Sequence, residues 1–248
     1  MAVGGERDPD PTLLAVSTVP TGVSAEAHRY LYAGGPANIA NLLRFLADTL
    51  SMTGFGFEPP AVLEPVGVWD GAGLGATLTG RDESRPLVAV IFYRAHLVAG
   101  NTTYVRSLCD AIDAAGGDAV AVWTYSLRPE ADGAVPALER CRDLGVDVII
   151  TSTLAAGATA EGGDGWSVPG LDELGIPVIQ SPASSRSRAE WEADEAGLTP
   201  LDVASGLAIP EFDGRIIGPT FAFKEVVEEG EGGEILATRA HPERAARL

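Results

Sequence analysis

Residues 88–101 read VAVIFYRAHLVAGN, and this stretch decides the class of fold. Its first six residues form a continuous apolar run of strand length, and charged or titratable side chains follow at once. A buried strand with such an ending is typical of the centre of a parallel sheet. In open sheets of this kind, ligands bind at the carboxyl ends of the strands. We therefore expect one wall of a binding site at Arg94 and His96.

The same pattern repeats from Pro86 onward. Helical segments separate the first four of five apolar runs, which begin near Val88, Ala119, Val146, Ile176 and Leu207. The spacing is close to the roughly 30 residues of a strand–helix–strand unit. The sequence thus predicts an α/β fold with an open, mainly parallel sheet of about five strands and flanking helices, flavodoxin-like or periplasmic-binding-like. Right-handed crossovers would bring the carboxyl ends of the strands to one edge.

The rest of the chain predicts further segments around this sheet. Pro36 suits the first position of a helix, and apolar residues recur at helical spacing after it, so a helical hairpin should precede the sheet. The prolines and glycines of the next segment favour a surface connection. We expect a loose lead-in at 1–23, the helical hairpin at 24–52, a long connection at 53–85, the α/β domain at 86–224, and an acidic loop with the start of a truncated helix at 225–248.

Charge and composition exclude several classes of function. The net charge of −18 and the pI near 4.4 argue against binding to nucleic acid or to an anionic membrane. An acidic ligand would need a local group of arginines, since Lys224 is the only lysine. No apolar run approaches the ~18 residues of a membrane span, and the N-terminus lacks a signal pattern. Cys109 and Cys141 read as inert thiols. A cytoplasmic protein is the simplest expectation.

Polar residues gather after the predicted strands, and each has a structural alternative to a role in a site. His96 is either a functional imidazole or a loop residue with one hydrogen bond. A carboxylate such as Glu211 at the end of an apolar strand must be solvated, either by a binding site or partner or by capping a local turn. Asp213, followed by a glycine, also suits a turn. Ser184 and Ser185 could simply cap a helix. The candidates from the strand ends are Arg94, His96, Ser126, Ser184, Ser185, Arg186, Glu211 and Asp213, with Lys224 as a further cation.

Several separate motifs resemble the large subunit of class I cobalt chelatases of the CobN type. They are GGPANIANLLRFLADTL at 34–50, TGFGFEPP at 53–60, FYRAHLVAGNT at 92–102, SSRSRAEWEADEAGLTPLDVASGLAIPEFDGRI at 184–216 and FAFKE at 221–225. The magnesium-chelatase H subunit is similar more loosely, chiefly around LAIPEFDG. The resemblance covers roughly residues 24–248. Because the large subunits of that family are several times longer, the chain resembles an internal or N-proximal piece of one.

The resemblance implies a function and partners. In that family the large subunit binds the tetrapyrrole and the metal, and Co²⁺ is inserted into hydrogenobyrinic acid a,c-diamide during aerobic cobalamin biosynthesis. AAA+ type subunits of the CobS and CobT type hydrolyse ATP, with Mg²⁺, to drive the reaction. The remainder of the large subunit would be a further partner, and the isolated piece should be inactive.

The resemblance also assigns residues. Arg94, His96 and Asn101 match one family motif; Glu211 and Asp213 match a second; and Ser184, Ser185 and Arg186 match a third, less certainly. An imidazole such as His96 and a carboxylate such as Glu211 suit proton acceptance and metal delivery. Arg94 and Arg186 could pair with carboxylates of the substrate. We expect the 94–96 segment to face the 210–213 segment across the sheet edge.

Two other functions stay open. The chain could be a non-catalytic α/β ligand-binding or scaffold module, because one lobe rarely encloses a ring as large as a corrin. It could also be part of a magnesium-chelatase H-like subunit that acts on protoporphyrin. Absorbance during titration with the corrin ring would separate a real ring-binding site from a scaffold.

Overall fold

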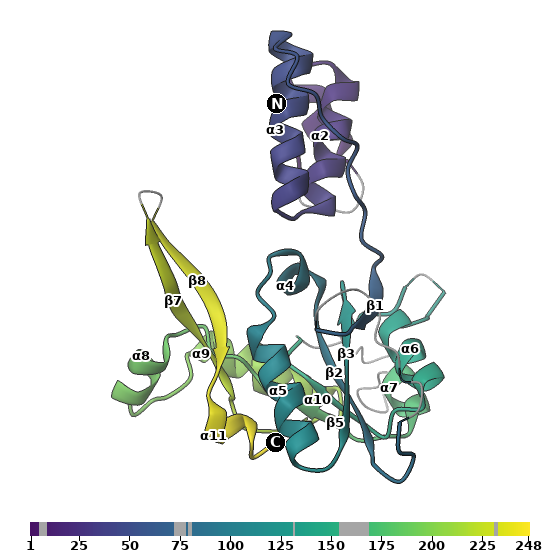
Figure 1. The fold of residues 1–248 in the computed structure, drawn as a ribbon, viewed down its shortest axis with the longest axis vertical. Helices are drawn as coiled ribbons and strands as arrows, with labels where there is room; N and C mark the ends of the chain where they lie inside the picture. Colours follow the sequence, from purple (N-terminus) through teal and green to yellow (C-terminus); the bar gives the residue numbers. More distant parts are fainter. Residues whose placement is uncertain (5–8, 72–77, 79–80, 131, 154–168, 231–232) are drawn as a thin grey trace. The chain divides into compact units, whose positions relative to one another are not determined.

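The computed structural model describes residues 1–4, 9–71, 78, 81–130, 132–153, 169–230 and 233–248. The chain forms two compact units, Met1–Glu64 and Pro65–Leu248 (Figure 1). Each unit is described by itself. No described helix is both long and apolar enough to cross a membrane.

The first unit contains the predicted helical hairpin, α2 (Thr21–Ala33) and α3 (Pro36–Ser51). Gly34 and Gly35 separate the two helices at φ values of 68° and 86°, a conformation that side chains with a Cβ rarely adopt. Tyr30 and Phe45 pack in its core with their ring centroids 5.8 Å apart. The expected loose lead-in at 1–23 is instead partly helical. Asp10 caps the short helix α1 (Pro11–Val16), whose first residue is a proline.

The second unit is built on a six-stranded sheet with the order β1-β3-β2-β4-β5-β6. Strands β2 to β6 run parallel, and β1 is antiparallel to β3, so the predicted open, mainly parallel sheet is confirmed. Strand β2 lies at its centre, and residues 87–92 are all buried. The strands are β1 (Val66–Trp69), β2 (Leu87–Tyr93), β3 (Asp118–Thr124), β4 (Val148–Thr151), β5 (Val178–Gln180) and β6 (Ile216–Ile217).

Helices cover both faces of this sheet. Helix α5 (Thr103–Ala114) packs on one face through Tyr104, Val105 and Leu108, while α6 (Pro136–Leu144) and α7 (Pro169–Leu174) cover the other (Figure 1). The alternate side chains of β2 therefore point into two apolar layers, which explains its unbroken apolar sequence. The remaining helices of this unit are α4 (Arg94–Val98), α8 (Arg188–Ala193), α9 (Pro200–Val203), the π-helix η1 (Ala204–Ala208), α10 (Ile209–Phe212) and α11 (Pro242–Ala245).

Two predicted segments have a different structure. The expected strand near Leu207 is helical, because Thr199 caps a helix that starts at Pro200 and continues through η1 and α10. A short apolar run does not by itself distinguish a strand from a helix. Strand β1 lies within the segment 53–85, which we expected to be a connection.

The expected acidic loop at the start of 225–248 is part of a β-hairpin. Strands β7 (Ala222–Gly230) and β8 (Gly233–Ala240) pair antiparallel, with Lys224 opposite Thr238. The base of the hairpin packs against α5 and α8, and its outer part extends away from the sheet (Figure 1). The β7–β8 hairpin can carry many glutamates because much of its surface is exposed to solvent. Even its apolar residues Ile235 and Leu236 are each 52% exposed.

Candidate functional site

The carboxyl ends of β2, β4 and β5 lie together at one edge of the sheet, as the parallel pairing requires. Strand β2 leads directly into α4, which carries Arg94 and His96. Strands β4 and β5 end at Thr151 and Gln180, both buried. Thr151 and Thr153 share a hydrogen bond of 2.8 Å between their hydroxyl groups. The edge is therefore polar and largely buried.

His96 has the features of an imidazole available for proton transfer. Its ring lies edge-on to Tyr104, with ring centroids 5.2 Å apart. Its Nδ1 atom is buried and has no hydrogen-bond partner among the described residues. Burial lowers the pKa of His96, and the positive charge of Lys224 lowers it further, against an opposing hydrogen bond with the Asn101 backbone. The imidazole is therefore neutral at neutral pH, the form that accepts a proton.

Asn101 attaches the β7–β8 hairpin to the loop after α4. Its Oδ1 accepts a hydrogen bond from the backbone N–H of Thr238 at 2.9 Å, and its Nδ2 donates to the Thr238 hydroxyl at 3.3 Å. Thr238 pairs with Lys224 in the hairpin. The exposed Lys224 is thus held near His96, whose pKa it influences. Both the Oδ1 and the Nδ2 atoms of Asn101 are therefore engaged in hydrogen bonds within the protein.

Arg215 is a buried residue of this edge that the sequence analysis did not single out. Its Nη1 donates to Gln180 Oε1 at 2.7 Å and to the carbonyl oxygen of Thr153 at 3.1 Å. Its Nη2 forms an ion pair with Asp213 Oδ2 at 3.1 Å, and neither side chain is exposed. Burial lowers the pKa of Arg215, while the charge of Asp213 opposes this change. The sequence carried no clear signal for this burial, since Ile216 and Ile217, the apolar residues that follow Arg215, are themselves exposed.

The predicted serine and arginine contacts to substrate are occupied by internal hydrogen bonds. Ser184 Oγ accepts from the backbone N–H of Arg186 at 3.1 Å. Ser185 donates from its hydroxyl to Asp202 Oδ2 at 2.9 Å. Arg186 forms an ion pair with Asp194. These bonds join the segment before α8 to the segments after it.

The two remaining predicted residues are Ser126 and Glu211. Ser126 Oγ accepts a hydrogen bond from the backbone N–H of Arg128 at 2.9 Å, in the turn after β3. Glu211 is exposed on α10. Within the described part of the chain, no hydrogen bond or ion pair joins the side chain of Glu211 to His96. The strand expected at 207–214 is absent, because the chain is helical there, but Asp213 at the end of this segment still reaches the sheet edge through its ion pair with Arg215.

The described side chains also include possible metal ligands and two thiols. Among those residues, no group of three or more histidines, cysteines, aspartates or glutamates is placed to hold a metal ion. Burial raises the pKa of the Cys109 and Cys141 thiols to about 12, so both thiols stay protonated.

Comparisons with known proteins place the chain among chelatase subunits. The family model described as CobN/Magnesium Chelatase matches residues 28–248. The aerobic cobaltochelatase subunit CobN of Sinorhizobium sp is 32% identical over 236 residues, which cover 89% of this chain and 18% of that protein. CobN of Pseudomonas aeruginosa is 29% identical over 241 residues, which cover 94% of this chain and 18% of that protein.

A solved structure extends this similarity to the fold. The catalytic subunit of cobaltochelatase from Mycobacterium tuberculosis matches with a TM-score of 0.73 and 40% sequence identity, over 99% of this chain and 20% of that one. The chain therefore spans about a fifth of the length of the relatives it matches.

Proposed function

This chain belongs to the CobN/magnesium chelatase family, and from that premise we propose that it is part of the tetrapyrrole-binding large subunit of a cobalt chelatase. The proposed reaction inserts Co²⁺ into hydrogenobyrinic acid a,c-diamide, while AAA+ type partner subunits of the CobS and CobT type hydrolyse ATP with Mg²⁺. The single observation that supports this most is the 40% identity to a solved cobaltochelatase subunit over 99% of this chain.

His96 is the proposed proton acceptor of this chain. Metal insertion requires the ring to give up its pyrrolic protons, and a neutral imidazole is the side chain best suited to take them near pH 7. The lowered pKa of His96 keeps it neutral. Its Nδ1 is buried and has no hydrogen-bond partner among the described residues.

Lys224 is the proposed contact for a carboxylate of the substrate. Its ammonium group is exposed beside the edge that carries His96. The two arginines proposed from the sequence are less suited, because Arg186 pairs with Asp194 and Arg94 is buried. Lys224 would also offset locally the repulsion of an acidic substrate by a chain of net charge −18.

Glu211 is a separate proposal. Its carboxylate is exposed on α10 and could hand a divalent cation to the ring, since oxygen ligands bind such cations without holding them irreversibly.

Single variants of the full-length large subunit test these roles. His96→Gln keeps a polar side chain but removes the proton acceptor, so we expect a fall in kcat of roughly 10²-fold or more at unchanged ring binding. Lys224→Gln should instead raise the KM for the ring.

Glu211→Gln tests the proposed delivery of the metal. Its matched control is Glu195→Gln, which changes an exposed glutamate between α8 and α9. Unchanged chelation by both His96→Gln and Glu211→Gln would reject the proposed chemistry.

A scaffold function is the second candidate, and a specific observation favours it. The side chains of Asn101, Ser185, Arg186 and Asp213 all make internal contacts that hold the fold together. Titration of this chain with hydrogenobyrinic acid a,c-diamide, followed by absorbance, separates the two functions. A saturable spectral change supports a ring-binding site, and its absence supports a scaffold. The same titration with protoporphyrin tests the magnesium-chelatase alternative.

A further inference from the structure

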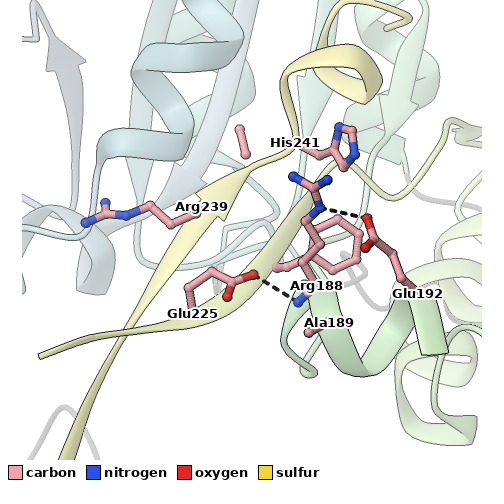
Figure 2. A pocket seen from close by; sticks show the side chains of 8 residues that line it. Arg188, Ala189, Glu192, Glu225, Arg239 and His241 are labelled. Carbon is pink, nitrogen blue, oxygen red and sulfur yellow. Dashed lines mark hydrogen bonds and ion pairs between the residues drawn. The ribbon is translucent and has the colours of Figure 1, made fainter. Parts of the chain in front are cut away.

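A cavity of about 390 Å³ lies between α8 and the base of the β7–β8 hairpin. Figure 2 shows its lining, with Arg188 and Glu192 from α8 on one side and Glu225 and Arg239 from the hairpin on the other. His241, just after β8, closes one end. None of these residues belongs to the site proposed above, and the volume falls within the range of small-molecule sites.

The two carboxylates in the cavity are already engaged by Arg188. Glu192 Oε1 accepts a hydrogen bond from Arg188 Nε at 2.7 Å, and Glu225 Oε1 accepts one from the Arg188 backbone N–H at 2.9 Å. Both contacts are drawn in Figure 2. These bonds fix the position of Arg188 and leave its Nη1 and Nη2 groups without a hydrogen-bond partner among the described residues.

The open nitrogen atoms converge at one end of the cavity. In Figure 2 the guanidinium group of Arg188 extends toward the imidazole of His241. The Nδ1 atom of His241 is buried and has no hydrogen-bond partner among the described residues. Arg239 extends in another direction in this view, and it adds a further positive charge to the wall. The two guanidinium nitrogen groups of Arg188 that have no acceptor suit an oxyanion, and the His241 imidazole forms the wall beside them.

The remaining wall is apolar. Ala189 and Ala240 line it together with Phe223, which is 1% exposed and packs against Trp191 with ring centroids 5.1 Å apart. Such a wall can accept a short hydrocarbon chain next to the charged end. A ligand that matches both ends would carry an acceptor group on a short aliphatic stem.

We propose that this cavity binds a carboxylate carried on a short aliphatic chain, with its oxygen atoms between Arg188 and His241. The charges of Arg188 and Arg239 balance those of Glu192 and Glu225, so a single negative charge is accommodated better than the double charge of phosphate. The other charged groups near this end are Glu243 and Arg244 of α11.

Propionate titration of the 248-residue chain tests the proposal. The chain has three histidines, so ¹H–¹⁵N spectra of the imidazoles can report on His241, with His28 and His96 as internal references. Propionate should shift the His241 signals saturably, with a Kd on the order of millimolar for so small a ligand. Equal shifts with uncharged propionamide, or no saturation, would overturn the proposal. Tighter binding of inorganic phosphate would also overturn it.

Variants locate the binding. Arg188→Gln should weaken propionate binding by about tenfold, as loss of a charge-assisted hydrogen bond predicts, and Arg239→Gln should weaken it less. Arg140→Gln, an exposed arginine on α6, removes the same charge elsewhere and should leave binding unchanged. If Arg188→Gln and Arg140→Gln weakened propionate binding equally, the loss would be a general effect of charge, and the assignment of the binding site to the Arg188 cavity would be overturned.

A second arm identifies the source of the carboxylate. If it is a side chain of the proposed ring substrate, Arg188→Gln in the full-length subunit raises KM for the ring. If the carboxylate belongs to a free small molecule, KM is unchanged while propionate binding is still weakened. The propionate titration does not require chelatase activity, so its outcome is separate from that of the proposed function.

Discussion

His96 and Arg215 are two titratable side chains at the same sheet edge with opposite surroundings. Arg215 is enclosed by Asp213, Gln180 and the carbonyl oxygen of Thr153, which together satisfy much of its hydrogen-bonding capacity. The Nδ1 atom of His96 has no such partner among the described residues, although it is buried. A satisfied buried charge stabilises one arrangement of the chain, whereas an unsatisfied neutral imidazole is available for binding or proton transfer.

Removal of Asp213 should strongly destabilise the second unit. Asp213→Ala leaves the Arg215 charge buried without its ion-pair partner, which costs about 3–5 kcal/mol. Urea unfolding followed by tryptophan fluorescence measures the change. Glu192→Ala breaks an exposed ion pair of the same unit and should cost less than about 1 kcal/mol. Equal losses for the two variants would contradict a structural role for the buried pair.

His96 should make the stability of the chain depend on pH. Its pKa is lower in the folded chain than the roughly 6.5 of an unfolded one, so the unfolded chain binds more protons between these two values. The free energy of unfolding therefore falls as pH decreases through about 6.5 and below. His96→Gln should lose less stability than the wild type between pH 7.5 and pH 5.5 in urea unfolding. Identical losses would show that His96 does not titrate differently on folding.

At the scale of elements, the β7–β8 hairpin depends on a contact between residues 137 positions apart in the sequence. Two-stranded hairpins are marginally stable alone. Here α5 and α8 support the base, and Asn101 binds both the backbone and the side chain of Thr238. This contact fixes β8, which pairs with the strand that carries Lys224, and therefore contributes to the site without touching a ligand.

Asn101→Ala should loosen the hairpin. The variant removes two hydrogen bonds and leaves the Thr238 N–H without its acceptor, at a cost of about 1–3 kcal/mol. Hydrogen exchange of the Thr238 amide should accelerate. Ser107→Ala is the control, because the Ser107 hydroxyl donates only to a carbonyl of its own helix. Unchanged exchange at Thr238 in Asn101→Ala would show that the hairpin is held by other contacts.

At the scale of the whole molecule, the net charge of −18 opposes folding through repulsion between carboxylates. The chain has few compensating cations, because it contains 17 lysine and arginine residues against 35 aspartates and glutamates. Basic or cationic partners would be attracted to such a surface, and acidic ligands need local cationic groups such as Lys224 or the Arg188 cavity.

Salt should therefore stabilise the chain. Screening of the repulsion should raise Tm between about 0.01 M and 0.15 M NaCl, over which the Debye length falls from ~30 Å to ~8 Å. Differential scanning calorimetry at pH 7.5 measures the change, with sucrose at equal osmolality as a control for solvent exclusion. A Tm that does not depend on salt would show that the carboxylates are spaced too widely to repel one another.

The sequence alone predicted those features that depend on local patterns. The apolar run of β2 predicted a central buried strand, and Pro36 with the apolar residues at helical spacing after it predicted the hairpin of α2 and α3; both are confirmed. The motifs also identified the family. In each case the signal lies within a few turns of helix or one strand, where neighbouring residues determine which face is buried.

Only the tertiary structure decided which polar residues bind one another. Asp213 pairs with Arg215, Ser185 with Asp202 and Asn101 with Thr238, and these pairings engage three side chains that the sequence had suggested for a ligand. The apolar run at 207–209 likewise became a helix through the cap at Thr199 and the packing that follows it. The physical reason is that burial follows a local period, whereas a hydrogen-bond partner is set by how distant segments pack.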